Sequence, residues 1–129
     1  MDKEEAANLA QRFLRFIEAR DLESADAMMD PNARITFPGS RVFDTQADMV
    51  QASSDRYQWV KKTFDQVDVF TENTTFVVYV IGTLYGVNRY GVSFSGIRYV
   101  DRFVIMKGLI TQQDVWNDLA ESGVLEQRV

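Results

Sequence analysis

One carboxylate stands in the middle of an otherwise apolar strand face. In the stretch IRYVDRFVI, side chains alternate between two faces, because successive residues of a β-strand point to opposite sides of the sheet. The apolar face would carry Ile97, Tyr99, Asp101, Phe103 and Ile105. A buried carboxylate must be paired, hydrogen-bonded or protonated, since leaving it ionised and alone costs free energy. Asp101 is therefore a candidate acid, base or hydrogen-bond donor, and the competing interpretation is a structural carboxylate paired with another element.

Two residue types that often carry chemistry are absent from the sequence. The chain has no histidine, which is the commonest general base and metal ligand, and no cysteine, which excludes thiolate chemistry and disulfides. Catalysis would have to use carboxylate, Tyr, Lys, Arg or amide side chains. Since the ligand sets for a metal ion or an organic cofactor are also missing, we expect no cofactor and no metal.

Length and charge limit the class of protein. A chain of 129 residues is expected to form one domain, 1–129, and a hydrophobic fraction of 46% argues against disorder. The net charge is -5 and the basic residues are scattered, so we expect no nucleic-acid partner. The first residues are too polar for a signal peptide, and no apolar run approaches the roughly 20 residues that span a bilayer. We expect a soluble cytoplasmic protein without a membrane partner.

The first half of the sequence is mainly helical. Apolar residues at spacings of three and four predict an amphipathic helix over 3–20. Asp21 can cap a short second helix, which the Asp-Pro-Asn turn at 30–32 would end. A short strand is predicted over 33–37, and a third helix would follow, capped by Asp44 or Thr45 and running to about residue 57.

The second half alternates strands and turns. Strands are predicted over 63–71, 75–86, 93–106 and 109–116, followed by a helical turn in which Asp118 and Glu121 have capping-box spacing. Helices followed by an antiparallel meander predict an α+β domain whose helices cover one face of a curved sheet. Such a sheet closes into a cone, and its apolar interior is a natural pocket for a small molecule.

Three stretches carry a resemblance to a known superfamily. They are ANLAQRFLRFIEARDLESADAMMDPNARITFPG, GTLYG and YVDRFVIMKGLITQQDVWNDLAE. The chain resembles the nuclear-transport-factor-two-like superfamily, with its cystatin-like cone, and within it the SnoaL-like and ketosteroid-isomerase-like enzymes. The resemblance covers nearly the whole chain. It implies the fold, and leaves the reaction open because this scaffold hosts isomerases, cyclases, epoxide hydrolases, dehydratases and noncatalytic modules.

The resemblance to ketosteroid isomerases implies a role for Asp101. Those enzymes carry an oxyanion-stabilising Asp in a strand motif similar to Val100-Asp101-Arg102-Phe103. Phe13 and Phe37 stand where they carry a Tyr and the general-base Asp, so the chain is not a steroid isomerase of the standard kind. SnoaL-like cyclases often have a His where Leu84 stands. Asp101 is the one element that both comparisons share.

Limonene epoxide hydrolase is similar in outline and places further residues. In this chain Tyr99 stands where that enzyme has an Arg, and its second acidic position falls near Asp114 or Val115. Judged by this similarity, Gln113, Val115 and Asn117 face the pocket, whereas Asp114 and Trp116 face away. A slip of one residue in the alignment would exchange these two sets.

These observations define a candidate site for an apolar small-molecule ligand. The predicted catalytic residues are Asp101, Tyr99 and Asn117. The predicted ligand-binding residues are Phe13, Phe37, Val80, Leu84, Phe103, Gln113 and Val115, with Trp59 at the pocket mouth. The expected activity is an isomerase, cyclase, hydratase or lyase step, and the alternative is a noncatalytic binding or interaction module of the same fold.

The opposite face of the sheet predicts a partner. If Val78, Val80 and Leu84 point inward, the outward residues are Val77, Tyr79, Ile81, Thr83 and Tyr85. Monomers seldom expose an apolar patch of this size. We therefore expect a homodimer that forms through the outer sheet face.

Overall fold

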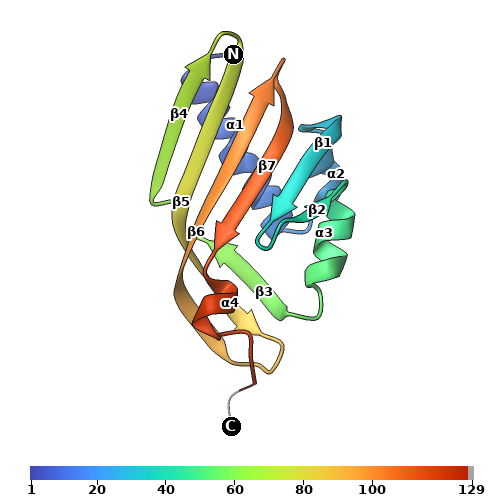
Figure 1. The fold of residues 1–129 in the computed structure, drawn as a ribbon, viewed down its shortest axis with the longest axis vertical. Coiled ribbons are helices and arrows are strands. Elements are labelled where there is room, and N and C mark those ends of the chain that lie inside the picture. Colours follow the sequence, from blue (N-terminus) through green and yellow to red (C-terminus); the bar gives the residue numbers. More distant parts are fainter. Residues whose placement is uncertain (128–129) are drawn as a thin grey trace.

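The computed structural model describes residues 1–127, in which short helices pack with a strongly curved sheet (Figure 1). The helices are α1 (Lys3–Glu18), α2 (Leu22–Asp26), α3 (Gln46–Ser53) and α4 (Leu119–Ser122). The strands are β1 (Met29–Phe37), β2 (Arg41–Phe43), β3 (Tyr57–Lys62), β4 (Gln66–Glu72), β5 (Thr75–Asn88), β6 (Ser93–Met106) and β7 (Leu109–Asn117). None of the helices in this range is long and apolar enough to cross a membrane.

The strands form one sheet in the order β2-β1-β7-β6-β5-β3. Only the β1–β7 pair is parallel within the described chain; the other pairs are antiparallel. β3 and β4 share one edge of β5, with β4 on its first half and β3 on its second. Figure 1 shows α1 lying across one face of the long strands. The predicted α+β architecture is confirmed.

The first helix forms where its apolar stripe predicts. A capping box fixes its start, because the Glu5 N–H donates to Asp2 Oδ1 at 2.8 Å and the Asp2 N–H donates back to the Glu5 side chain. The buried face of α1 consists of Ala6, Leu9, Ala10, Phe13 and Leu14. These side chains join the core formed by the inward faces of β5 and β6, which closes the cone along most of its length.

The inward and outward faces of the long strands are as the alternation predicts. On β6, Ile97, Tyr99, Asp101, Phe103 and Ile105 are all buried, and on β5, Val78, Val80 and Leu84 are buried too. Their neighbours along each strand are half-buried or exposed. The register places Val80 opposite Asp101 on one side and Val115 opposite it on the other. The carboxylate therefore lies between two apolar strand neighbours.

Strand β1 is longer than predicted. It begins at Met29, so the Asp-Pro-Asn sequence at 30–32 lies within the strand instead of ending a helix. The pairing with β7 is irregular between Met29 and Arg34, and in this interval the Asn32 N–H donates to Asp30 Oδ1 at 2.8 Å. A proline is compatible with a strand at such an irregularity, where no ladder hydrogen bond is lost.

Two further strands were not predicted. β2 returns along β1 through a three-residue turn at 38–40, in which Gly39 and Ser40 both have positive φ. Helix α3, capped by Thr45, ends at Ser53 and not near residue 57. Residues 57–62 then form β3, which extends the sheet beyond the predicted strand at 63–71.

The predicted capping box at the last helix is wrong. Asp118 occupies the N-cap of α4 but makes no side-chain capping bond. Its carboxylate accepts instead from Arg98 Nε at 2.8 Å, and Asn117 Oδ1 accepts the Leu119 N–H at 3.1 Å. The helix start is thus satisfied by the preceding residue, which leaves Asp118 available for the ion pair.

A glycine in β5 determines where β3 ends. Between β3 and β4 the chain stays on β5 through two bonds, Thr63 N–H to Thr83 O and Asp65 N–H to Ile81 O, each 2.9 Å long. A Cβ added to Gly82 would lie 2.2 Å from the Thr63 carbonyl oxygen, so no other residue fits without backbone movement. This close approach brings Lys62, the last residue of β3, to the inner side of the sheet.

Candidate active site

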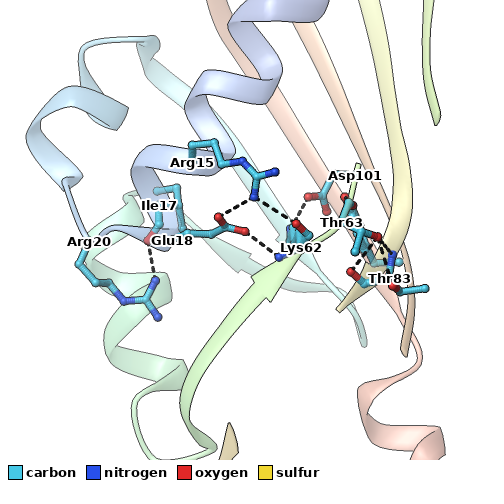
Figure 2. Close-up of polar contacts among 9 residues, drawn as sticks. Arg15, Ile17, Glu18, Arg20, Lys62, Thr63, Thr83 and Asp101 are labelled. Carbon is cyan, nitrogen blue, oxygen red and sulfur yellow. Dashed lines mark hydrogen bonds and ion pairs between the residues drawn. The ribbon is translucent and has the colours of Figure 1, made fainter. Parts of the chain in front are cut away.

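Asp101 is the most deeply buried charged group of the candidate site. Its side chain is 0% exposed, and its only ion-pair partner in the described residues is Lys62, whose Nζ contacts Asp101 Oδ2 (Figure 2). The other carboxylate oxygen, Oδ1, is buried and has no hydrogen-bond partner in residues 1–127. A purely structural carboxylate is normally bonded through both oxygens. One of the two Asp101 oxygens therefore has no donor among the described residues.

Burial and Lys62 act on Asp101 in opposite directions. Burial raises the pKa of Asp101, because desolvation disfavours the carboxylate. The charge of the Lys62 ammonium and its hydrogen bond lower the same pKa, but by less, so the result is a raised value. Desolvation is therefore the dominant influence on this carboxyl group.

Lys62 is held by the first helix through its backbone. Its N–H donates to Glu18 Oε2 at 2.7 Å, and its carbonyl accepts from Arg15 Nη1 at 3.1 Å. Arg15 and Glu18 also pair with each other at 2.8 Å (Figure 2). This network ties the end of β3 to α1 and fixes the position from which the Lys62 side chain extends to Asp101.

Tyr99 contacts the Lys62–Asp101 pair, and its hydroxyl is already hydrogen-bonded and so is not free to bind a ligand. Its hydroxyl donates to the Thr63 carbonyl at 2.6 Å, and its ring lies 4.8 Å from Lys62 Nζ, a cation–π distance. Burial raises the pKa of Tyr99, and the neighbouring Asp101 carboxylate raises it further. Tyr99 is therefore a protonated hydrogen-bond donor at neutral pH that positions Lys62.

A small pocket opens beside Lys62. It has a volume of about 80 Å³, and its wall combines apolar side chains with a few polar ones. The lining residues are Leu14, Ile17, Glu18, Arg20, Phe37, Met49, Tyr57, Val60, Lys62, Leu84, Val115, Asn117 and Leu119. Lys62 is 18% exposed and belongs to this wall, whereas Asp101 does not. A ligand in the pocket would meet the lysine, and the carboxylate would act through it.

The structure divides the predicted ligand-binding residues into two groups. Phe37, Leu84 and Val115 line this pocket, together with Asn117 from the predicted catalytic set. Phe13, Val80, Phe103 and Gln113 are packed core: the rings of Phe13 and Phe103 meet edge to face at 5.6 Å, and Gln113 accepts from Gln46 at 3.2 Å. The interior of the cone is filled at that end, so the cavity is confined to the other end, near Lys62.

The structure places Trp59 away from the pocket. Its side chain is 42% exposed, and its ring contacts Tyr85 on the outer sheet face at a centroid distance of 6.1 Å. Because side chains of a strand alternate, Val60 and Lys62 of β3 point inward while Trp59 and Lys61 do not. The prediction for Trp59 was based on chain order alone, and its strand neighbours occupy the pocket wall instead.

The sequence analysis missed Lys62 and its supports, Arg15 and Glu18. A signal was available in Tyr57-Gln58-Trp59-Val60, whose aromatic and β-branched residues favour a strand. Alternation along that strand would have placed Val60 and Lys62 on one face. No local signal indicates that this face meets Asp101, which lies 39 residues further along the chain.

The site contains no arrangement suited to a metal ion. Within residues 1–127, no group of three or more His, Cys, Asp or Glu side chains is close enough to hold one. The chemistry that the described side chains can supply is proton transfer and hydrogen bonding by Lys62, with Asp101 behind it and the Asn117 amide at the pocket wall.

Comparison with known proteins agrees with this architecture. The sequence pattern of the SnoaL-like domain matches residues 10–113, which include the second half of α1, Lys62 and Asp101. The chain belongs to the SnoaL-like family. No protein with a curated description matches it at a significant level of sequence similarity. The family assignment therefore rests on the domain as a whole and not on a characterised close relative.

Solved structures show the same fold at low sequence identity. An NTF2-like protein of unknown function from Burkholderia pseudomallei has a TM-score of 0.76 and 16% identity, covering 98% of this chain and 100% of its own. TerC, crystallised with polyporic acid, has a TM-score of 0.73 and 14% identity over 93% and 97%. A proposed polyketide cyclase from Xanthomonas campestris has a TM-score of 0.69 and 13% identity, covering 96% of this chain and 98% of its own. At these identities, the similarity between these three structures and this SnoaL-like chain shows only that they share a fold.

Proposed function

We propose that this SnoaL-like protein is a cofactor-independent enzyme that acts on a carbonyl compound through the Lys62–Asp101 pair. The observation that carries the proposal is the contact of the buried Asp101 with a lysine that lines the pocket. Perturbed carboxylates beside a cavity are frequent at active sites. A solved structure of the same fold is described as a proposed polyketide cyclase, and a cyclase step is among the reactions that we propose for this chain.

The proposed mechanism assigns separate roles to the two residues. Lys62 Nζ donates a hydrogen bond or a proton to the carbonyl oxygen, which stabilises the negative charge that develops there during an isomerase, cyclase, hydratase or lyase step. Asp101 does not touch the ligand. It balances the charge of Lys62 and exchanges with Lys62 the proton that the lysine gives to the carbonyl oxygen. Asn117 lines the same pocket, and its amide nitrogen makes no hydrogen bond to a described residue, so it can orient the ligand.

The pocket wall limits the ligand. Phe37, Leu84 and Val115 provide an apolar surface, which suits a hydrophobic or aromatic compound. A volume of about 80 Å³ is well below the roughly 300 Å³ at which drug-sized ligand sites begin. A ligand of a few heavy atoms fits directly, and a larger compound would have to displace side chains of the wall.

A noncatalytic binding module is the second candidate function. Phe37 lines the pocket where the resembling isomerases carry their general base, and phenylalanine cannot take a proton. If that base has no replacement, the same pocket would bind a ligand without converting it.

Turnover and binding separate the two candidates. A panel of small ketones, from butanone to small cyclic ketones, should be converted by the wild type and by Lys61→Met, whose side chain lies outside the pocket, but not by Lys62→Met. Leu84→Trp should fill the pocket and abolish binding and turnover while the protein stays folded, because occupying a cavity avoids the strain of overpacking. Binding without turnover in the wild type would establish the binding module.

We also propose a homodimer formed through the outer sheet face. The register aligns Ile81, Val100 and Trp116 in one row across β5, β6 and β7, and Trp116 is 53% exposed. A self-complementary contact between two copies would cover this row.

A further inference from the structure

The pocket contains a single primary amine. The chain has four lysines, of which Lys3, Lys61 and Lys107 are exposed to solvent, while Lys62 lies in the pocket wall. Primary amines of lysine can attack carbonyl carbons and form imines, provided that the amine is unprotonated when it reacts. The question for Lys62 is whether its surroundings can take up the proton of the ammonium group.

Asp101 is placed to accept that proton. Transfer from Lys62 Nζ to Asp101 converts an ion pair into a neutral amine and a neutral acid, and the net charge of the pair stays zero. In bulk water the ion pair strongly predominates. Here the carboxylate is 0% exposed and its Oδ1 has no donor within residues 1–127, so the ionised arrangement lacks the solvation that normally favours it. Of the other charged groups at this pocket, Glu18 is bound to Arg15, and Arg20 donates to the Ile17 carbonyl at 2.7 Å.

We propose that Lys62 forms a reversible imine with small aldehydes and ketones that enter the pocket, with Asp101 as its proton partner. Asp101 takes a proton from the ammonium, and the freed lone pair forms the C–N bond at the carbonyl carbon. The nitrogen then passes a proton to the carbonyl oxygen, Asp101 returns its proton to the nitrogen, and with a second proton from the nitrogen this oxygen leaves as water. The balance is ammonium plus carbonyl giving a protonated imine plus water, with Asp101 again a carboxylate.

The pocket selects which carbonyl compounds can react. Leu84 and Val115 give it an apolar wall, which limits the access of water that would hydrolyse the imine. Its volume of about 80 Å³ is smaller than the roughly 150 Å³ of a cavity that admits benzene. We therefore expect compounds the size of propanal or butanone to react before larger ones. This inference shares with the proposed function only the placement of a carbonyl group beside Lys62.

Reductive trapping tests the proposal without a known substrate. The full chain is incubated with propanal and sodium cyanoborohydride, which reduces a protonated imine to a stable amine, and the modified residue is located by peptide mass spectrometry. We expect one propyl group per chain, on Lys62, before the other three lysines or the N-terminal amine react. Modification of Lys3, Lys61 and Lys107 at the same rate as Lys62 or faster would overturn the proposal.

Variants identify the partners of the reaction. Lys61→Arg should leave the rate of trapping unchanged, and Lys62→Arg should abolish the early modification. Asp101→Asn, which cannot exchange a proton, should slow trapping at Lys62 by on the order of tenfold or more. Trapping in Asp101→Asn as fast as in the wild type would remove Asp101 from the mechanism. Circular dichroism melting curves confirm that each variant is folded.

The outcomes separate this inference from the proposed function. Trapping at Lys62 without turnover of any ketone in the panel would retain the imine and exclude the enzyme as proposed. Turnover that depends on Lys62, but without trapping, would retain the enzyme, with the lysine acting only as a hydrogen-bond donor. The first result supports imine formation at Lys62, and the second excludes it.

Discussion

At the scale of single residues, Asp101 should be a cost to stability at neutral pH. Its folded-state pKa is raised above the unfolded value of roughly 3.9. The contribution of Asp101 to the stability of the folded state is therefore fully present below about pH 3.9, where the group is protonated. This contribution is lost as the pH rises through the folded-state pKa. We expect Asp101→Asn to raise the free energy of unfolding at pH 7 by about 1 kcal/mol or more, and to have little effect near pH 4. Urea unfolding at both pH values measures this, and a less stable variant at pH 7 would show that Asp101 is an ionised, well-paired structural carboxylate.

Removal of Lys62 should have the opposite effect. Lys62→Met leaves a fully buried carboxylate without its only ion-pair partner in the described chain, so the variant should lose about 2 to 4 kcal/mol at pH 7. The loss should shrink as the pH falls, because the unpaired Asp101 can then be protonated at little cost. Adding Asp101→Asn to Lys62→Met should restore most of the stability. Equal losses in the single and double variants would mean that Lys62 stabilises the fold by packing alone.

At the scale of elements, Gly82 controls the position of β3. A methyl group there would meet the Thr63 carbonyl, which also accepts the Tyr99 hydroxyl. We expect Gly82→Ala to destabilise the protein by about 1 to 3 kcal/mol. It should also move Lys62 away from Asp101, so that ketone turnover and propanal trapping both fall. Ser95→Ala, at an exposed position of β6, is the control and should leave all three measurements unchanged.

The contrast between β6 and β3 explains how much of the site could be predicted. The burial of Asp101 follows from alternation within its own strand, which is local information, whereas the parity of Val115 and Asn117 on β7 was inferred only from the resemblance to limonene epoxide hydrolase. Lys62 reaches Asp101 only because β3 and β6 flank β5 and because Gly82 admits the close approach. That geometry depends on pairing between distant segments, which residue patterns do not encode.

The size of the cavity also could not be predicted from sequence. Phe13, Val80 and Phe103 are apolar residues that could equally line a pocket or pack in a core. Only the contact between the Phe13 and Phe103 rings shows that they are packed core. The fold class was easier to predict, because the order of helices and strands allows few arrangements. The catalytic role of Asp101 stays a prediction.

At the scale of the whole molecule, the outer face should determine the oligomeric state. We expect sedimentation at micromolar concentration to give about twice the 14.8 kDa mass of the chain. Trp116→Glu should shift the protein to monomer, because it introduces a charge at the most exposed end of the row formed with Ile81 and Val100. Val92→Glu, at an equally exposed position in the β5–β6 hairpin, should not. A wild type that sediments at the mass of one chain would exclude the dimer.

The bond between Glu18 and the Lys62 N–H also bears on aggregation. β3 is an edge strand, and the free N–H groups of an edge are sites where a strand from another molecule can add. Glu18 occupies one such donor with a negatively charged side chain, and Arg15 occupies the carbonyl of the same residue. The contacts that hold the candidate active site together thus also prevent another strand from pairing with β3 at Lys62. The Arg15–Glu18 ion pair on α1 therefore protects this edge of the sheet from aggregation.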